Sequence, residues 1–438
     1  MRPAFIALCL TLPIGALAAD PAYERDPIRY SESIATTPIT KIADRIQNGE
    51  PLLNKPSGRE NLLELLELLD IPKESQILVY SKTSAQNGLI SPKTPRAIYF
   101  NENTYIGWVP GGNIETISFD KKLGAVFHMI HLAGATDNES PKILRHQSCL
   151  DCHAGSRTKG FPGLVARSVI PMETGRPILH AGTFTIDDTS PISERWGGWY
   201  VTGETGDHSH LGNIIGHEED EQEVTVEKIK TEPLTDLASI INTDKFPGGA
   251  QSDVVALMVF EHQINVHNAL VRANHTARQT LYRHRTMTKL LKEPKSTPLS
   301  ESSQGILDSA AEDVVRALLY ADEFIMENDG PEGADDFYSA FLANAQADSE
   351  GRSLKDFRLY ERLFKYRCSY LIYSDPFQHL PPVIKSRVLN KLHTILTSPT
   401  PPADYEYLSD TERERINHIL KETLPDWPAS VAENPKEA

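Results

Sequence analysis

Cysteine is scarce in this chain, with four among 438 residues. A scaffold held mainly by disulfides needs a much higher density of cysteine, so that class of secreted protein is excluded. Basic residues are also in the minority, because 44 lysines and arginines face 60 aspartates and glutamates and leave a formal net charge of −16. Proteins bind nucleic-acid phosphates through basic surfaces that displace counterions, so we expect no nucleic-acid partner for this acidic chain.

A long apolar run is missing beyond the first 19 residues. Residues 1–19 combine one arginine, an apolar stretch broken at 13–15, and small residues up to Ala19. This layout predicts a cleavable secretory signal that is cut near Ala19, with an uncleaved anchor as the alternative. Cys9 follows Leu8, where a lipobox would need a small residue, so no lipid anchor is expected. We therefore expect a periplasmic or secreted protein with no membrane span in the mature chain.

The strongest chemical motif is Cys149-Leu150-Asp151-Cys152-His153. Two cysteines three positions apart can reach the two vinyl groups on one edge of a porphyrin, and the histidine that follows can bind the iron. The motif predicts one haem c per chain, bound covalently through Cys149 and Cys152, with His153 as the proximal iron ligand. Export agrees with this prediction, because bacteria attach haem c outside the cytoplasm.

Three other uses of the motif remain as alternatives. A structural zinc site would need a second Cys/His pair with ligand spacing, and no second C-x-x-C is present. A thioredoxin-like redox pair would follow a buried strand in a βαβ unit, and a plain disulfide would join cysteines only three positions apart. The flanking residues 145–148 and 154–157 give no βαβ context. The haem interpretation is therefore favoured, and only one such motif occurs.

The sixth coordination position of the iron decides between electron transfer and chemistry at an open site. We name three distal candidates: His210 in the polar loop 206–213, and His262 and His267 in a predicted helix over 253–291. Five residues correspond to about 500° on a helix, so His262 and His267 point about 140° apart and cannot both face one haem. Ordinary packed polar histidines are the alternative for both.

Four further residues have candidate roles outside this shortlist. Met172 lies in a predicted hairpin turn between 165–170 and 178–184, which makes it a weaker candidate for the iron. Arg157 and Arg167 follow the motif closely and could pair with haem propionates, although surface salt bridges would serve them equally well. Cys368 lies in an apolar helical stretch and is expected to be buried and unpaired.

The predicted fold is α+β, with an antiparallel strand-rich N-terminal half that carries the haem and an all-helical C-terminal half. Its length makes it larger than a minimal class I cytochrome c. The regions are a signal peptide (1–19), an extended arm with one short helix (20–55), a strand-rich haem c-binding region (56–215), an acidic linker (216–250), a helical region that packs on it (251–430) and a disordered tail (431–438).

Alternation and turn residues predict the individual elements. A capping box over 57–60 precedes a helix. The strands are expected at 76–81, 97–100, 105–109, 114–119 and 124–132, with another near 199–201. The helices are expected at 61–69, 253–291, 306–326, 336–346, 354–373, 382–397 and 411–424. Residues 217–228 are expected to form a solvated acidic loop.

Several runs together resemble an uncharacterised family of exported bacterial proteins with a mono-haem cytochrome c motif. They are 94–101, 149–153 with 163–169, 194–203, 261–268 and 368–374. The resemblance extends from about residue 76 to the C-terminus. It implies haem c at Cys149, Cys152 and His153 but no established activity. This sequence has Asp187 and Asp188 where the resemblance leads us to expect a histidine.

Three functions follow from these predictions. We favour a periplasmic c-type cytochrome that transfers electrons, whose acidic surface selects a basic redox partner protein. One alternative is a peroxidase-like or oxygenase-like haem enzyme with an open distal site, so enzymatic activity is left undecided. The other is a haem-based sensor or accessory subunit. The oligomeric state has no signal in the sequence.

Overall fold

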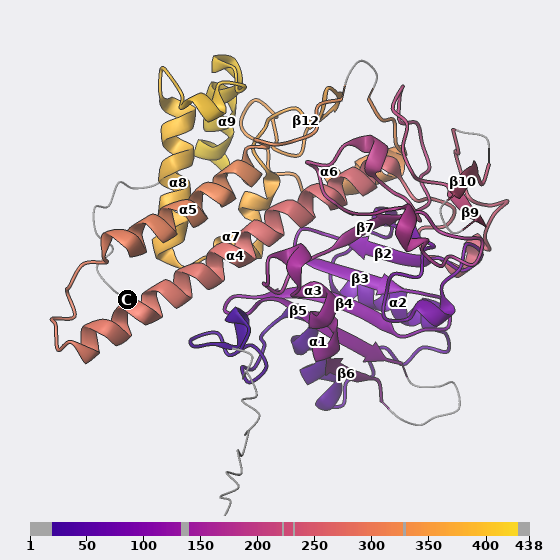
Figure 1. Ribbon diagram of the computed structural model, residues 1–438, viewed down its shortest axis with the longest axis horizontal. Helices are drawn as coiled ribbons and strands as arrows, with labels where there is room; N and C mark the ends of the chain where they lie inside the picture. Colours follow the sequence, from indigo (N-terminus) through magenta and orange to yellow (C-terminus); the bar gives the residue numbers. More distant parts are fainter. Residues whose placement is uncertain (1–19, 133–139, 221–222, 231–232, 327–329, 428–438) are drawn as a thin grey trace, which may run out of the picture.

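The computed structural model describes residues 20–132, 140–220, 223–230, 233–326 and 330–427. Within them the chain has a mixed α+β fold, with a six-stranded antiparallel sheet and several long helices (Figure 1), which confirms the expected class. The helices are α1 (Pro38–Gln47), α2 (Gly58–Leu68), α3 (Leu150–His153), α4 (Val254–Leu290), α5 (Glu301–Leu318), α6 (Asp335–Leu342), α7 (Asp375–Gln378), α8 (Pro382–Thr397) and α9 (Asp410–Thr423). The strands are β1 (Ile77–Val79), β2 (Arg96–Phe100), β3 (Thr104–Trp108), β4 (Ile114–Asp120), β5 (Gly124–His131), β6 (Lys142–Arg145), β7 (Ala166–Val169), β8 (Thr183–Ile186), β9 (Ile214–Asp220), β10 (Glu223–Lys228), β11 (Phe357–Tyr360) and β12 (Arg362–Phe364).

The large sheet is a meander whose strands pair in chain order from β1 to β6. The turn between β2 and β3 follows from local chemistry, because Asn101 Oδ1 accepts hydrogen bonds of 2.9 Å from the backbone N–H groups of Asn103 and Thr104. An asparagine that bonds its own chain two or three residues on is a common way to close such a turn. The five strands expected between 76 and 132 are all present, and 199–201 lies beside β1 through a bridge between Val79 and Trp199.

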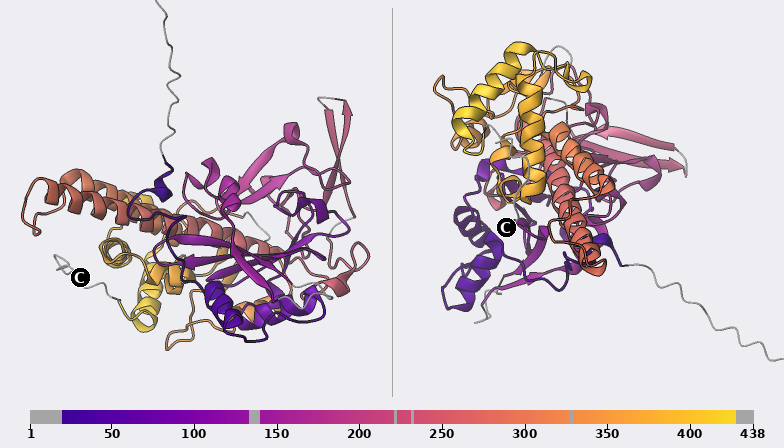
Figure 2. Two further views of the ribbon diagram at one scale, coloured as in Figure 1. Left: turned by 90° about the horizontal axis from the view of Figure 1, so that it is seen from below. Right: turned by 90° about the vertical axis from the view of Figure 1, so that its left-hand side faces the viewer.

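The two faces of the sheet are covered by different helices. Ala97 and Tyr99 belong to a core with α1 and α2, whereas Ile98 and Phe100 belong to the core that includes α4. Alternate residues of a strand point to opposite faces, so both faces of β2 are apolar because both are buried. Figure 2 shows α1 and α2 on one side of the sheet and the long α4 on the other.

Helix α4 begins at Val254 and is capped by Asp253, whose carboxylate accepts hydrogen bonds of 2.9 Å from the backbone N–H groups of Val255 and Ala256. It continues for 37 residues. The helix approaches the sheet closely at Gly124, which has a φ of +71° and no room for a side chain, because a Cβ there would lie 2.8 Å from Val271. Gly124 therefore sets the distance between β5 and α4.

The remaining long helices stack in sequence order beyond α4. Helix α5 packs between α4 and α8, and α8 packs against α9. The buried residues of α5 recur at helical spacing and include Leu307, Ala311, Val314 and Leu318. No helix in the part of the chain that the structure describes is long and apolar enough to cross a membrane.

The short helix expected within residues 20–55 is present as α1, which is longer than expected and follows a capping box at Thr37. One expectation for the middle region was wrong. Residues 217–228 are not a solvated loop, because β9 and β10 form a hairpin there. Alternating β-branched residues such as Val224 and Val226 favour a strand here, despite the acidic residues beside them.

The helix expected over 354–373 was also wrong, so the C-terminal half is not all-helical. Strands β11 and β12 form a tight hairpin in that region, with Glu361 between them at a φ of +62°. Phe357 and Phe364 face each other across the hairpin with ring centroids 5.3 Å apart. A cross-strand aromatic pair of this kind stabilises a hairpin, so a hairpin forms here although the spacing of apolar residues is helical. Residues 1–19 and 431–438 lie outside the described residues.

Candidate functional site

The motif 149–153 forms one short turn of helix beside the sheet. Cys149 ends a 3₁₀ turn, and α3 carries Cys152 and His153. Cys149 is partly buried and Cys152 is exposed, and neither forms a disulfide. A one-turn helix places residues three positions apart on one side, so both thiols are available to one ligand.

His153 is held in a defined orientation. Its Nδ1 lies 2.9 Å from the carbonyl oxygen of Gly163, and its own carbonyl accepts a hydrogen bond of 2.8 Å from the Gly163 N–H. The ring also packs on Phe127 of β5, with centroids 4.8 Å apart. Because Nδ1 donates to the carbonyl, the neutral ring keeps its lone pair on Nε2. No hydrogen bond to Nε2 occurs within the described residues.

The loop that contains Gly163 and Leu164 is itself fixed by hydrogen bonds to helix α4. Asn268 of α4 accepts a hydrogen bond of 2.8 Å from the Leu164 N–H and donates one of 3.0 Å to the Leu164 carbonyl. The fit is close, because a Cβ at Gly163 would lie 2.4 Å from Asn268 Oδ1. Asn268 therefore positions the loop, and through Gly163 it positions His153.

The sheet near the motif carries a charged pair. Arg96 of β2 reaches across Gly107 and forms a salt bridge with Glu115 of β4. Burial raises the pKa of the Cys149 thiol to about 11, and the negative charge of Glu115 contributes. Burial lowers the pKa of His153, although its bond to the Gly163 carbonyl opposes that shift. Both effects favour the uncharged forms of the Cys149 thiol and the His153 imidazole.

Two arginines lie in the electrostatic neighbourhood of Cys152. Burial lowers the pKa of Arg167, the positive charge of Arg157 lowers it further, and the Cys152 thiol opposes the shift. The Arg167 guanidinium donates a hydrogen bond of 2.8 Å to the Thr183 hydroxyl, while its Nε is buried without a partner. The two arginines therefore form a positive region next to the motif.

His262 has both ring nitrogens engaged in the interior. Nδ1 lies 2.7 Å from a carboxylate oxygen of Asp188, and Nε2 lies 2.7 Å from the Ser369 hydroxyl. The ring stacks on Tyr320 at 4.2 Å and is fully buried. Burial lowers the pKa of His262 to about 3, so it is neutral. No nitrogen remains for iron, and His262 does not fit the distal role expected of it.

The arrangement Ser369–His262–Asp188 has the order of a hydrolase triad, but it is sealed. The Ser369 hydroxyl also accepts a hydrogen bond of 3.2 Å from the Leu371 N–H at the start of a 3₁₀ turn. Ser369 and His262 have no exposed surface. A nucleophile must reach its substrate. The three residues therefore join α4, the loop after β8 and the C-terminal region.

His267 and His210 remain distal candidates on prediction alone. His267 Nδ1 lies 2.7 Å from the Tyr105 hydroxyl, and its Nε2 is buried without a hydrogen-bond partner in the described chain. His210 Nδ1 accepts a hydrogen bond of 2.9 Å from the Gly212 N–H, and its ring packs edge-on against Trp196. Met172 occupies the hairpin turn expected for it, where its N–H bonds to the Arg176 carbonyl.

The described residues contain no group of three or more His, Cys, Asp or Glu side chains arranged to hold a metal ion. Comparison of the chain with models of protein families, with curated proteins and with solved structures finds no match in any of the three. The resemblance drawn from the sequence motifs therefore remains a prediction.

Sequence reasoning missed the residues that orient His153. Gly163 and Asn268 lie within runs that carried the resemblance, but nothing local linked them to each other or to the histidine. Phe127 lay in a correctly predicted strand without an assigned role. The contact between the Gly163–Leu164 segment and Asn268 could be found only in a structure, because it joins segments 104 residues apart.

Proposed function

We propose that this chain is an exported mono-haem c-type cytochrome, with haem c attached through Cys149 and Cys152 and with His153 as the proximal ligand. One observation carries the proposal: His153 Nδ1 is bonded to the Gly163 carbonyl at 2.9 Å, which leaves Nε2 for iron next to two unbridged cysteines. Histidines that bind metals almost always donate their other N–H to a carbonyl or carboxylate.

The residues present fit the group in chemistry as well as in spacing. Cys149 and Cys152 supply the two thiols that add to vinyl groups, and the packing of His153 on Phe127 holds the imidazole in place. Arg157 and Arg167 supply positive charge for two propionates. When bound, haem c supplies a one-electron redox couple whose potential depends on its axial ligands and burial.

Electron transfer is the activity that these residues support best. The Gly163 carbonyl makes His153 a stronger donor, which favours the oxidised state of the iron. The chain's net charge of −16 provides long-range attraction for a basic partner protein, which weakens as salt screens it. The α+β fold then divides into a strand-rich region that carries the haem and a largely helical region that packs on it.

The first experiment asks whether the haem is attached. The full chain, signal included, is expressed in a bacterial host that matures c-type cytochromes, and the exported protein is examined by intact mass and by its pyridine haemochrome spectrum. We expect one haem per chain and removal of residues 1–19. The Cys149→Ser and Cys152→Ser variants should each lose one thioether bond.

A matched control uses the third cysteine of the mature chain. Cys368 is free and fully buried, so Cys368→Ala removes a thiol without touching the motif. That variant should keep its haem. An exported wild-type chain with both thiols of the motif unmodified would overturn the proposal.

The second experiment separates a carrier from a haem enzyme. Carbon monoxide is added to the reduced protein, and the Soret spectrum is followed. A six-coordinate carrier should bind carbon monoxide slowly or not at all, whereas an open site should bind it at once. His210→Ala and His267→Ala then test the two remaining distal candidates, with His262→Gln as the comparison that should leave the coordination unchanged.

A further inference from the structure

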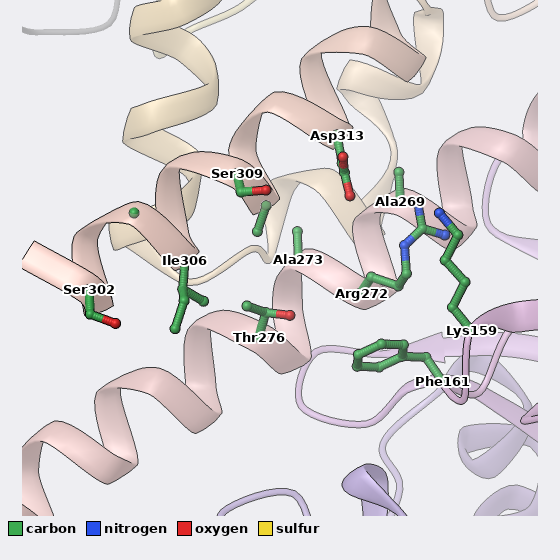
Figure 3. Close-up of a pocket in the computed structure, with 12 residues that line it drawn as sticks. Lys159, Phe161, Ala269, Arg272, Ala273, Thr276, Ser302, Ile306, Ser309 and Asp313 are labelled. Carbon is green, nitrogen blue, oxygen red and sulfur yellow. The ribbon is translucent and has the colours of Figure 1, made fainter.

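A cavity of about 520 Å³ lies between α4, α5 and the loop that follows the motif (Figure 3). Lys159 and Arg272 lie at one end of the view, and Ser302 and Ile306 lie at the other. Phe161 forms the wall on the side of the motif, where it packs against the same hydrophobic core as Cys149 does. The cavity is therefore separate from the proposed haem site but shares a wall with it.

The cationic end of the cavity lacks partners. Neither Lys159 nor Arg272 forms an ion pair within the residues that the structure describes, and Arg272 Nε is buried without a hydrogen bond. Burial lowers the pKa of Arg272, and the carboxylate of Asp313 across the cavity only partly opposes that shift. A guanidinium with a buried, unpartnered Nε is costly unless an anion or water satisfies it.

Apart from the Asp313 carboxylate, the rest of the cavity is lined by uncharged residues. Thr276, Ser302 and Ser309 line it, and none of these hydroxyls has a hydrogen-bond partner in the described chain. Ile306 is 38% exposed and adds an apolar surface at the same end as Ser302. The volume falls within the range of pockets that hold small molecules. Two cations at one end and hydroxyl groups along the other suit an elongated ligand with one anionic group.

We propose that this cavity binds a small organic anion. Its carboxylate or phosphate group pairs with Arg272 and Lys159, and its body lies along Ser302, Ser309 and Ile306. Charge-assisted hydrogen bonds from a guanidinium and an ammonium group are the strong contacts of such a site. The proposal does not depend on the haem, because no lining residue belongs to the motif 149–153.

Thermal unfolding of the purified mature chain tests the proposal. Tm is measured against increasing inorganic phosphate and, separately, butyrate, with chloride matched for ionic strength. A specific site raises Tm along a saturable curve, because a ligand that binds only the folded state stabilises it by mass action. General salt effects of phosphate do not saturate. We expect saturation with at least one of the two anions and none with chloride, and the stronger anion identifies the head group.

Variants then assign the effect to the cavity. Arg272→Gln and Lys159→Gln should each weaken binding by about 10-fold to 100-fold, since each removes a charge-assisted contact. The control is Arg285→Gln on the same helix, because Arg285 is exposed and bonds only to the Leu281 carbonyl. Its Tm curve should match that of the wild type.

A third variant is expected to bind the anion more tightly, so it tests the site even if Arg272→Gln fails to fold. Asp313 is exposed and repels an anion, so Asp313→Asn should tighten binding by about 3-fold to 10-fold. Absence of a saturable shift in the wild type would overturn the proposal. So would a saturable shift that is unchanged in Lys159→Gln and Asp313→Asn, because the anion would then bind elsewhere.

Discussion

Replacement of Asn268 by alanine tests the chain of contacts that orients His153. The substitution removes two hydrogen bonds to the backbone of Leu164, whose side chain is only 3% exposed. Each bond contributes about 1 kcal/mol, and a buried N–H or carbonyl left without a partner costs about 1–3 kcal/mol. Partial entry of water reduces that sum. We expect Asn268→Ala to lower the free energy of unfolding by about 2–4 kcal/mol.

The same substitution should change the properties of the motif. Release of the 163–164 loop weakens the bond from His153 Nδ1 to the Gly163 carbonyl, so the imidazole becomes a poorer donor. In the haem-loaded protein the reduction potential should therefore rise, because the oxidised iron loses more stabilisation than the reduced iron. Urea unfolding followed by circular dichroism measures the first effect, and redox titration of the Soret band measures the second.

Asn274 provides the matched control on the same helix. It lies six residues after Asn268, is buried and donates a hydrogen bond of 3.0 Å to the Lys121 carbonyl, which is not part of the motif or of the 163–164 loop. Asn274→Ala should lower stability by about 1–3 kcal/mol and leave the potential unchanged. The reasoning is refuted if Asn268→Ala costs less than about 0.5 kcal/mol, or if both variants shift the potential equally.

Three further predictions concern the thiols, a buried carboxyl and the sealed triad. In haem-free protein, iodoacetamide should modify the exposed Cys152 first, Cys149 slowly because its pKa is raised to about 11, and Cys368 only after unfolding, as followed by peptide mass spectrometry. Burial raises the pKa of Glu323 to about 8, so the folded state binds its proton more tightly than the unfolded state does. Its contribution to stability is therefore lost as pH rises from about 4.5 to about 8, and Glu323→Gln should remove about 1–3 kcal/mol of that loss in urea titrations at several pH values. Ser369→Ala should cost about 1–3 kcal/mol in the same assay by leaving His262 Nε2 without a partner, and a neutral effect would show that water replaces the hydroxyl.

The elements that could be predicted from sequence are those with a local cause. Helix α8 was expected at 382–397 and is found at Pro382–Thr397, because a proline begins it and its apolar residues keep one period throughout. The capping box at Ser57 is present as expected, with Glu60 returning a hydrogen bond to the Ser57 N–H. Signals of this kind depend on residues three or four positions apart.

The misses have non-local causes. The 354–373 stretch has helical spacing, but Phe357 and Phe364 find each other across a turn and pack on Phe341. His262 was predicted as a distal ligand, but both of its ring nitrogens form hydrogen bonds, to Asp188 and to Ser369. These partners lie 74 and 107 residues away, and no pattern in the sequence links them. The prediction for the motif 149–153 rests on residues within five positions of one another, whereas the contacts that orient His153 come from distant segments.

The position of Asn268 has a consequence for the order of events during biogenesis. On the proposed function the chain is exported from its N-terminus, so Cys149, Cys152 and His153 would leave the membrane before the helix that carries Asn268. Until α4 arrives, the loop at Gly163 is untethered and Cys149 lacks part of its cover. On the proposed function, a haem-attaching enzyme would meet both thiols during that interval, and the docking of α4 would then close the site behind it.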